Sequence, residues 1–130
     1  MSQEPTPRTS VPQQPASRET ESQDLRLARI VLEDTQARHQ QITIDLVFEG
    51  NRIRPGNEYY GVWRDHQEES ICPFVMNANG EIDFGTSYGG EDRFYELDVL
   101  NAQIGLGQLV GMRSDQYETQ MKIVGVTQLI

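Results

Sequence analysis

The chain has little of the side-chain chemistry on which catalysis and metal binding usually depend. Its 130 residues include one cysteine and two histidines. A single cysteine cannot form an intramolecular disulfide, and Cys72, within Ile71-Cys72-Pro73-Phe74, is predicted to be a small buried hydrophobe. A Cys-His nucleophile or a metal site would require Cys72, His39 and His66 to meet in space. We therefore predict no metal and no cofactor.

Basic residues are scarce as well. Eleven Lys and Arg face 20 Asp and Glu, which gives a formal net charge of −9. The imbalance persists after residue 23, where 17 acidic residues face nine basic ones. Binding to nucleic acid depends mainly on Lys and Arg that neutralise phosphates. The charge balance therefore argues against nucleic acid and anionic membranes as partners.

Long apolar runs are absent too. No stretch approaches the roughly eighteen apolar residues that a membrane helix needs, and the N-terminus lacks the charged-then-apolar pattern of a signal peptide. We expect a soluble, cytoplasmic protein. The alternative is the mature form of a secreted protein whose signal has been removed.

The composition changes near residue 24. Residues 1–23 hold four of the six prolines and very few apolar side chains. Such a segment is predicted to be a disordered, solvated arm because it cannot bury a core. From Leu25 onward, apolar residues recur at strand spacing, and about 107 residues are enough for one domain. The predicted organisation is an arm over residues 1–23 and a single all-β domain over 24–130.

The apolar pattern after the arm is typical of β-strands. Between Ile42 and Phe48, apolar residues alternate with mostly polar ones, as in a half-buried strand. Residues 50–57 read as a loop, Asn79-Gly80 as a hairpin turn and Gly125 as a bulge in the last strand. Strands are predicted over residues 25–32, 42–48, 59–64, 71–76, 81–84, 93–100, 108–112 and 118–129.

About eight strands without a convincing long helix predict an antiparallel all-β fold. We expect a β-sandwich of two packed sheets, and a small closed β-barrel is the alternative.

The loop over residues 86–92 contains Tyr, Ser and Gly, a composition typical of adaptable recognition surfaces. Aromatic rings in and near it could stack against sugars while carboxylates accept hydrogen bonds from sugar hydroxyls. Trp63, the only tryptophan, is instead predicted to anchor the core. The candidate binding residues are Tyr59, Tyr60, Tyr88, Glu91 and Asp92.

No convergent catalytic set is evident. The carboxylate pairs Glu68-Glu69 and Glu91-Asp92 join neighbours in the chain, which point to opposite faces when the backbone is extended. A small hydrolase or metal enzyme that uses His66 is the weakest of the functions considered. We therefore predict no catalytic residue.

The preferred hypothesis is a non-enzymatic, acidic β-domain that acts as a protein-interaction or assembly module. Its partner would be another protein or a second copy of itself. A carbohydrate-binding, lectin-like module is the alternative. If the partner is a second copy, edge pairing is expected at the end of the last strand, residues 126–130, which lacks a charged gatekeeper. Removal of residues 126–130 should then abolish assembly.

Overall fold

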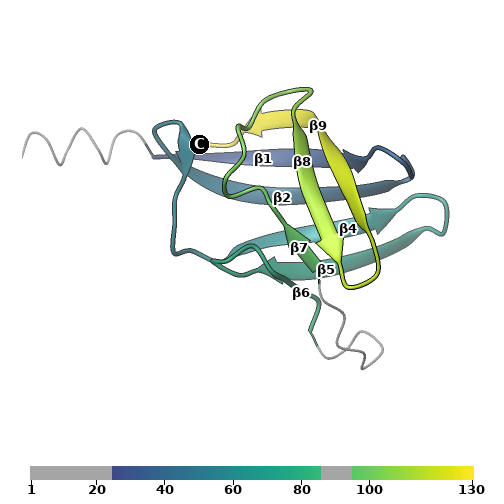
Figure 1. Ribbon diagram of the computed structural model, residues 1–130. Helices are drawn as coiled ribbons and strands as arrows, with labels where there is room; N and C mark the ends of the chain where they lie inside the picture. Colours follow the sequence, from purple (N-terminus) through teal and green to yellow (C-terminus); the bar gives the residue numbers. More distant parts are fainter. Residues whose placement is uncertain (1–24, 86–94) are drawn as a thin grey trace, which may run out of the picture.

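The computed structural model describes residues 25–85 and 95–130, and its regular structure there consists of antiparallel strands (Figure 1). The predicted arm and the candidate residues Tyr88, Glu91 and Asp92 lie outside the described residues. No helix in the described part has the length and apolarity needed to cross a bilayer. The strands are β1 (Leu25–Asp34), β2 (Gln40–Glu49), β3 (Arg52–Ile53), β4 (Tyr59–Asp65), β5 (Ser70–Met76), β6 (Ile82–Asp83), β7 (Tyr95–Leu97), β8 (Leu109–Ser114) and β9 (Glu118–Gln128).

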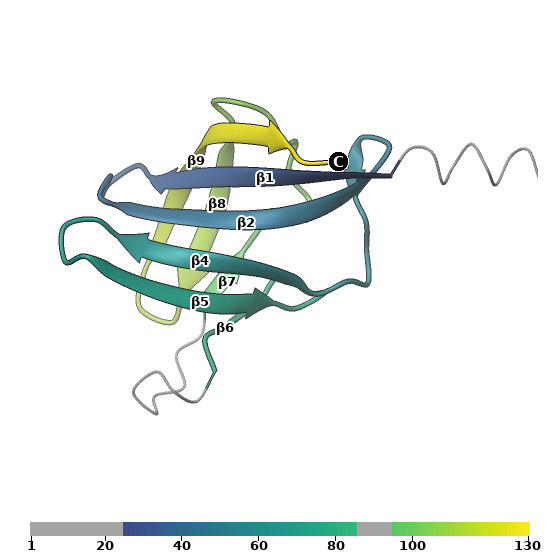
Figure 2. The same cartoon turned by 180° about the vertical axis from the view of Figure 1, so that it is seen from behind.

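The strands form one continuous sheet that curls back on itself. Its order is β6-β5-β4-β2-β1-β9-β8-β7, and β3 pairs with the end of β2. The two end strands approach each other through an isolated antiparallel bridge between Glu81 and Glu96. The result is a nearly closed, barrel-shaped sheet, visible from both sides in Figures 1 and 2.

The expected two-sheet sandwich is therefore wrong in its layering, and the physical reason lies in β9. The first part of this strand pairs with β8, through Lys122, and its later part pairs with β1. The register shifts where Gly125 faces Val31 and Ile123 faces Leu32, which leaves Val124 as the extra residue of a bulge. This bulge, predicted at Gly125, bends β9. The bent strand can therefore pair with β8 in its first part and with β1 in its later part, which joins the strands into one continuous sheet.

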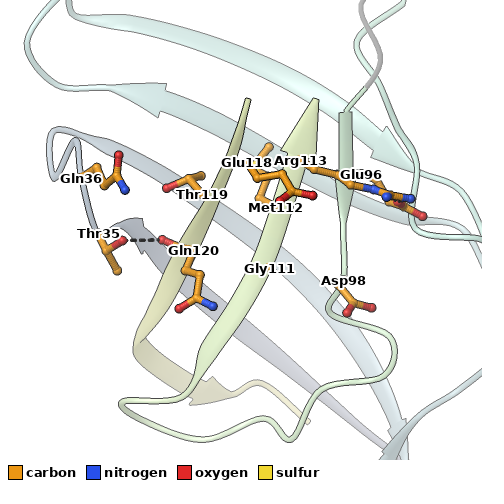
Figure 3. A pocket seen from close by; sticks show the side chains of 10 residues that line it. All are labelled: Thr35, Gln36, Glu96, Asp98, Gly111, Met112, Arg113, Glu118, Thr119 and Gln120. Atoms are coloured by element: carbon orange, nitrogen blue, oxygen red, sulfur yellow. Dashed lines mark hydrogen bonds and ion pairs between the residues drawn. The ribbon is translucent and has the colours of Figure 1, made fainter. Parts of the chain in front are cut away.

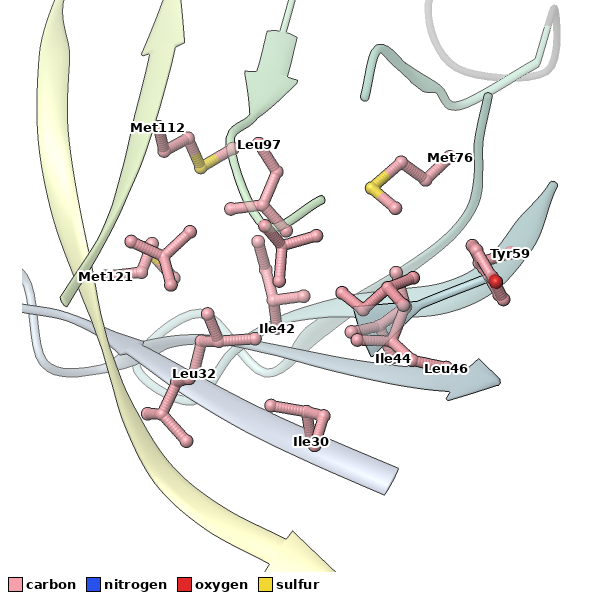
Figure 4. Close-up of a cluster of buried hydrophobic side chains, with 14 of the residues drawn as sticks. Ile30, Leu32, Ile42, Ile44, Leu46, Tyr59, Met76, Leu97, Met112 and Met121 are labelled. Carbon is pink, nitrogen blue, oxygen red and sulfur yellow. The ribbon is translucent and has the colours of Figure 1, made fainter. Parts of the chain in front are cut away.

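The core fills the inside of this curled sheet. Ile42, Ile44 and Leu46 alternate along β2 and are fully buried, as their period of two predicts. They meet inward side chains from the facing strands, among them Leu97 and Met121 (Figure 4).

Aromatic rings join the two ends of the sheet. The ring centroids of Trp63 and Tyr95 are 5.4 Å apart, and those of Phe84 and Tyr95 are 5.6 Å apart. Phe84 follows β6 and Tyr95 begins β7, so these contacts span the seam between the end strands. Trp63 packs against the core, as predicted.

Candidate functional site

The outward side chains of the β4–β5 hairpin are mostly apolar. Tyr60 pairs with Val75 and Val62 pairs with Pro73 across the two strands, and Ile71 lies beyond them. Tyr60 is 68% exposed and Ile71 59% exposed, although large apolar side chains usually face a core. We call the surface made by these five residues the apolar face.

The outward side chains of the β8–β9 hairpin provide a contrast, because the same pairing geometry carries polar chemistry there. Over the stretch in which β8 and β9 pair, Leu109 is the one exposed large apolar side chain; Tyr117 in the turn and Val124 and Val126 later in β9 lie outside this stretch. The other exposed outward residues of the paired stretch are Gly111, Arg113, Glu118, Gln120 and Lys122.

An open pocket of about 640 Å³ lies over β7, β8 and β9 (Figure 3). Gly111 contributes no side chain to its lining, and Arg113 donates a hydrogen bond from Nε to Oε1 of Glu96 at 2.7 Å. Asp98 and Glu118 add two further carboxylates. The pocket is thus polar and solvent-open, and its one arginine is already paired with a carboxylate.

The outer face of β1 and β2 pairs its charges internally. Arg29 donates to both oxygens of Asp45, at 2.8 and 3.0 Å, and this hydrogen-bonded charge raises the pKa of Arg29. Glu33 accepts hydrogen bonds from Gln41 and Arg38, which together lower its pKa. The charges of Arg29, Asp45 and Glu33 are therefore already paired within the protein, which makes this face a weaker candidate for binding a charged partner.

The structure separates the two candidate tyrosines that it describes. Tyr60 lies on the apolar face, whereas Tyr59 points inward and is only 3% exposed. The Tyr59 hydroxyl donates to the backbone oxygen of Arg54 at 2.7 Å. Tyr59 is therefore a core residue and not a ligand platform, because adjacent residues in a strand face opposite sides of the sheet.

Substitution Tyr59→Phe should show what this hydroxyl contributes. Burial raises the pKa of Tyr59, so the folded state favours the protonated phenol. The resulting stability is fully present below the unfolded pKa of about 10 and is lost as the pH rises toward the higher folded pKa. Urea unfolding should show a loss of about 1 kcal/mol at neutral pH and a weaker alkaline decline than in the wild type. An identical alkaline decline in the two proteins would contradict this assignment.

The structure places the two histidines next to each other and buries the cysteine. His66 Nε2 lies 3.1 Å from Oε1 of Gln41, and the His66 backbone N–H donates to the oxygen of His39. Cys72 is buried next to Trp63 on the paired strand, as predicted. In residues 25–85 and 95–130, no three His, Cys, Asp or Glu side chains gather in a way that could hold a metal ion.

No protein-family model, curated protein or solved structure matches this chain. Of the apolar face, only Tyr60 was among the candidate residues predicted from the sequence, and its exposure agrees with a place on the surface. The other four residues of the face were not predicted. The signal was present, since Tyr60, Val62 and Arg64 alternate with the inward Tyr59, Gly61 and Trp63.

Proposed function

We propose that the protein is an interaction module whose apolar face binds another protein. The observation that carries this proposal is the exposure of Tyr60 and Ile71 on a hairpin held by seven cross-strand pairs. Contiguous exposed apolar side chains on a soluble domain mark interaction sites. A tyrosine on a rigid strand supplies a large contact area for few lost rotamers, as interface hot spots do.

Charge indicates the chemistry of the partner. The apolar face is bordered by Asp83, which pairs with Val75 on the β6 side, and by Arg64, which pairs with Ile71. The chain as a whole carries a formal charge of −9. A partner with an apolar contact centre and a basic rim therefore fits best, because opposite potentials steer association and discourage wrong partners.

Affinity purification with matched variants tests the proposal. Tagged wild-type protein should retain a basic partner that Tyr60→Ser and Ile71→Ser lose, since each change removes exposed apolar contact area. Leu109→Ser is the matched control, because Leu109 is 51% exposed but lies on the polar β8–β9 hairpin. All three variants should unfold within about 0.5 kcal/mol of the wild type.

Two results would contradict the proposal. One is retention of the same partner by the Tyr60 and Ile71 variants at wild-type levels. The other is a signal on a glycan array that falls with Tyr60→Ser, because that result would favour the carbohydrate-binding alternative.

A further inference from the structure

The later part of β9 has a neighbouring strand on one side only. Pairing with β8 runs from Glu118 to Lys122. The last backbone bonds on that side join Ile123 to Gln108 and Gly107. Beyond Ile123, β9 pairs with β1 alone, and Figures 1 and 2 show this end of β9 running along β1. Within the described part of the chain, no strand pairs with its other side.

The hydrogen-bond phase on the β1 side shows which groups face outward. The Leu27 oxygen accepts from the Leu129 N–H at 2.7 Å, and the Leu27 N–H donates to the oxygen of Ile130 at 2.8 Å. Successive residues of a strand direct their backbone groups to opposite sides, so every second residue of β1 bonds to β9. After Leu27, the next residue that does so is Arg29. Arg29 pairs with Thr127, so Thr127 directs its backbone groups toward β1.

The residues on either side of Thr127 must then direct their backbone groups away from β1. These residues are Val126 and Gln128, since donors and acceptors alternate along an antiparallel strand. Val126 also has a 43% exposed side chain. The edge therefore presents a donor and an acceptor at every second residue, beside apolar side chains.

The chemistry of this edge differs from that of the other open edge. Residues 123–130 contain no charged side chain, and Val124 and Ile130 are 41% and 80% exposed. In β5, only Val75 and Met76 pair with β6, and the open stretch before them contains Pro73. Proline has no N–H to donate and blunts an edge against strand addition. The β9 edge has neither a charged side chain nor a proline to block the addition of a strand.

We infer that the β9 edge pairs with the same edge of a second copy of this chain, on a surface separate from the apolar face. In this antiparallel arrangement a two-fold axis passes beside Val126, whose N–H and C=O bond to those of Val126 in the other copy. Such an interface is isologous, because each copy contributes the same patch. The uncharged stretch also lets two chains of net charge −9 meet without placing like charges opposite each other.

Sedimentation velocity over a dilution series of the full chain tests this inference. The wild type should shift from dimer to monomer on dilution. In Val126→Lys, two ammonium groups would meet across the axis, so the dissociation constant should rise at least about tenfold. Leu109→Lys introduces the same charge at another exposed apolar residue and should leave the dimer unchanged.

Hydrogen exchange on the unmodified protein gives a second readout that does not depend on a variant's folding. The amides of Val126 and Gln128 should exchange slowly at high concentration and rapidly on dilution. The Thr127 amide, directed toward β1, should stay slow throughout. A wild type that sediments as a monomer at every concentration, or a dimer insensitive to Val126→Lys, would overturn the inference. Loss of partner capture by the apolar-face variants tests the other surface and leaves this result untouched.

Discussion

Replacement of Gly61 by alanine is expected to lower the free energy of unfolding by about 3 kcal/mol. A Cβ on Gly61 would lie 2.5 Å from Cζ of Phe74 and 2.8 Å from the backbone oxygen of Thr43. The Phe74 ring is buried against this glycine, and Thr43 lies on the neighbouring strand β2. Neither can retreat freely, so the sheet or the core must be distorted. Urea unfolding monitored by tryptophan fluorescence measures the loss.

Gly111→Ala is the matched control for this prediction. The nearest atom to a Cβ on Gly111 is Cβ of Asp98, at 4.0 Å, which is ordinary contact. This strand substitution should therefore change the stability by less than about 0.5 kcal/mol. Phe74→Leu should recover part of the loss when it is combined with Gly61→Ala, because it removes the ring that clashes. Equal effects of Gly61→Ala and Gly111→Ala would refute the packing argument.

Ile44→Ala should cost about 3 to 4 kcal/mol. Ile44 is fully buried and pairs with Ile30 on one side and Gly61 on the other, at the centre of the sheet. Truncation removes three buried methyl or methylene groups, so their packing contacts in the core are lost. It also leaves a cavity, which cannot collapse because paired strands hold β2 on both sides. Thermal and urea unfolding should both show the loss, with the denaturant slope unchanged.

Two milder changes serve as controls for Ile44. Ile44→Val removes one methylene group and should cost about 1 kcal/mol. Thr43→Ala, at the adjacent outward position of β2, should have a much smaller effect than Ile44→Ala, because Thr43 lies outside the core cluster. A loss at Thr43 that equals the loss at Ile44 would contradict the assignment of inward and outward faces.

Local features of the sequence were enough to predict eight of the nine strands in the described part of the chain. Alternation from Ile42 to Phe48 predicted β2, and its observed bounds extend the prediction by only one or two residues at each end. The glycine-bearing turn at residues 77–80 was also predicted, and Gly80 adopts a positive φ of 93° there. The two-residue strand Arg52–Ile53 was missed, because turn residues on both sides of it made the whole stretch read as a loop.

The layering could not be predicted in the same way. Barrel closure depends on which strands pair across long separations, such as Ala28 with Gln128, and periodicity carries no information about partners. A bulge was predictable from Gly125, but the sequence did not show that it divides β9 between two walls. The surface chemistry was only partly predicted: Tyr59 and Tyr60 were both candidate binding residues, and the structure exposes Tyr60 but buries Tyr59.

The pairing of β1 with β9 has a consequence during protein synthesis. β1 leaves the ribosome before the other eight strands, and β2 can cover one of its sides soon afterwards. Its other side, which includes Arg29 and Val31, must wait for β9, after every other strand has emerged. The sheet is therefore expected to be completed only after residue 128 has been translated. Until then one side of β1 is unpaired in the nascent chain, and this is when misassociation and chaperone binding are most expected.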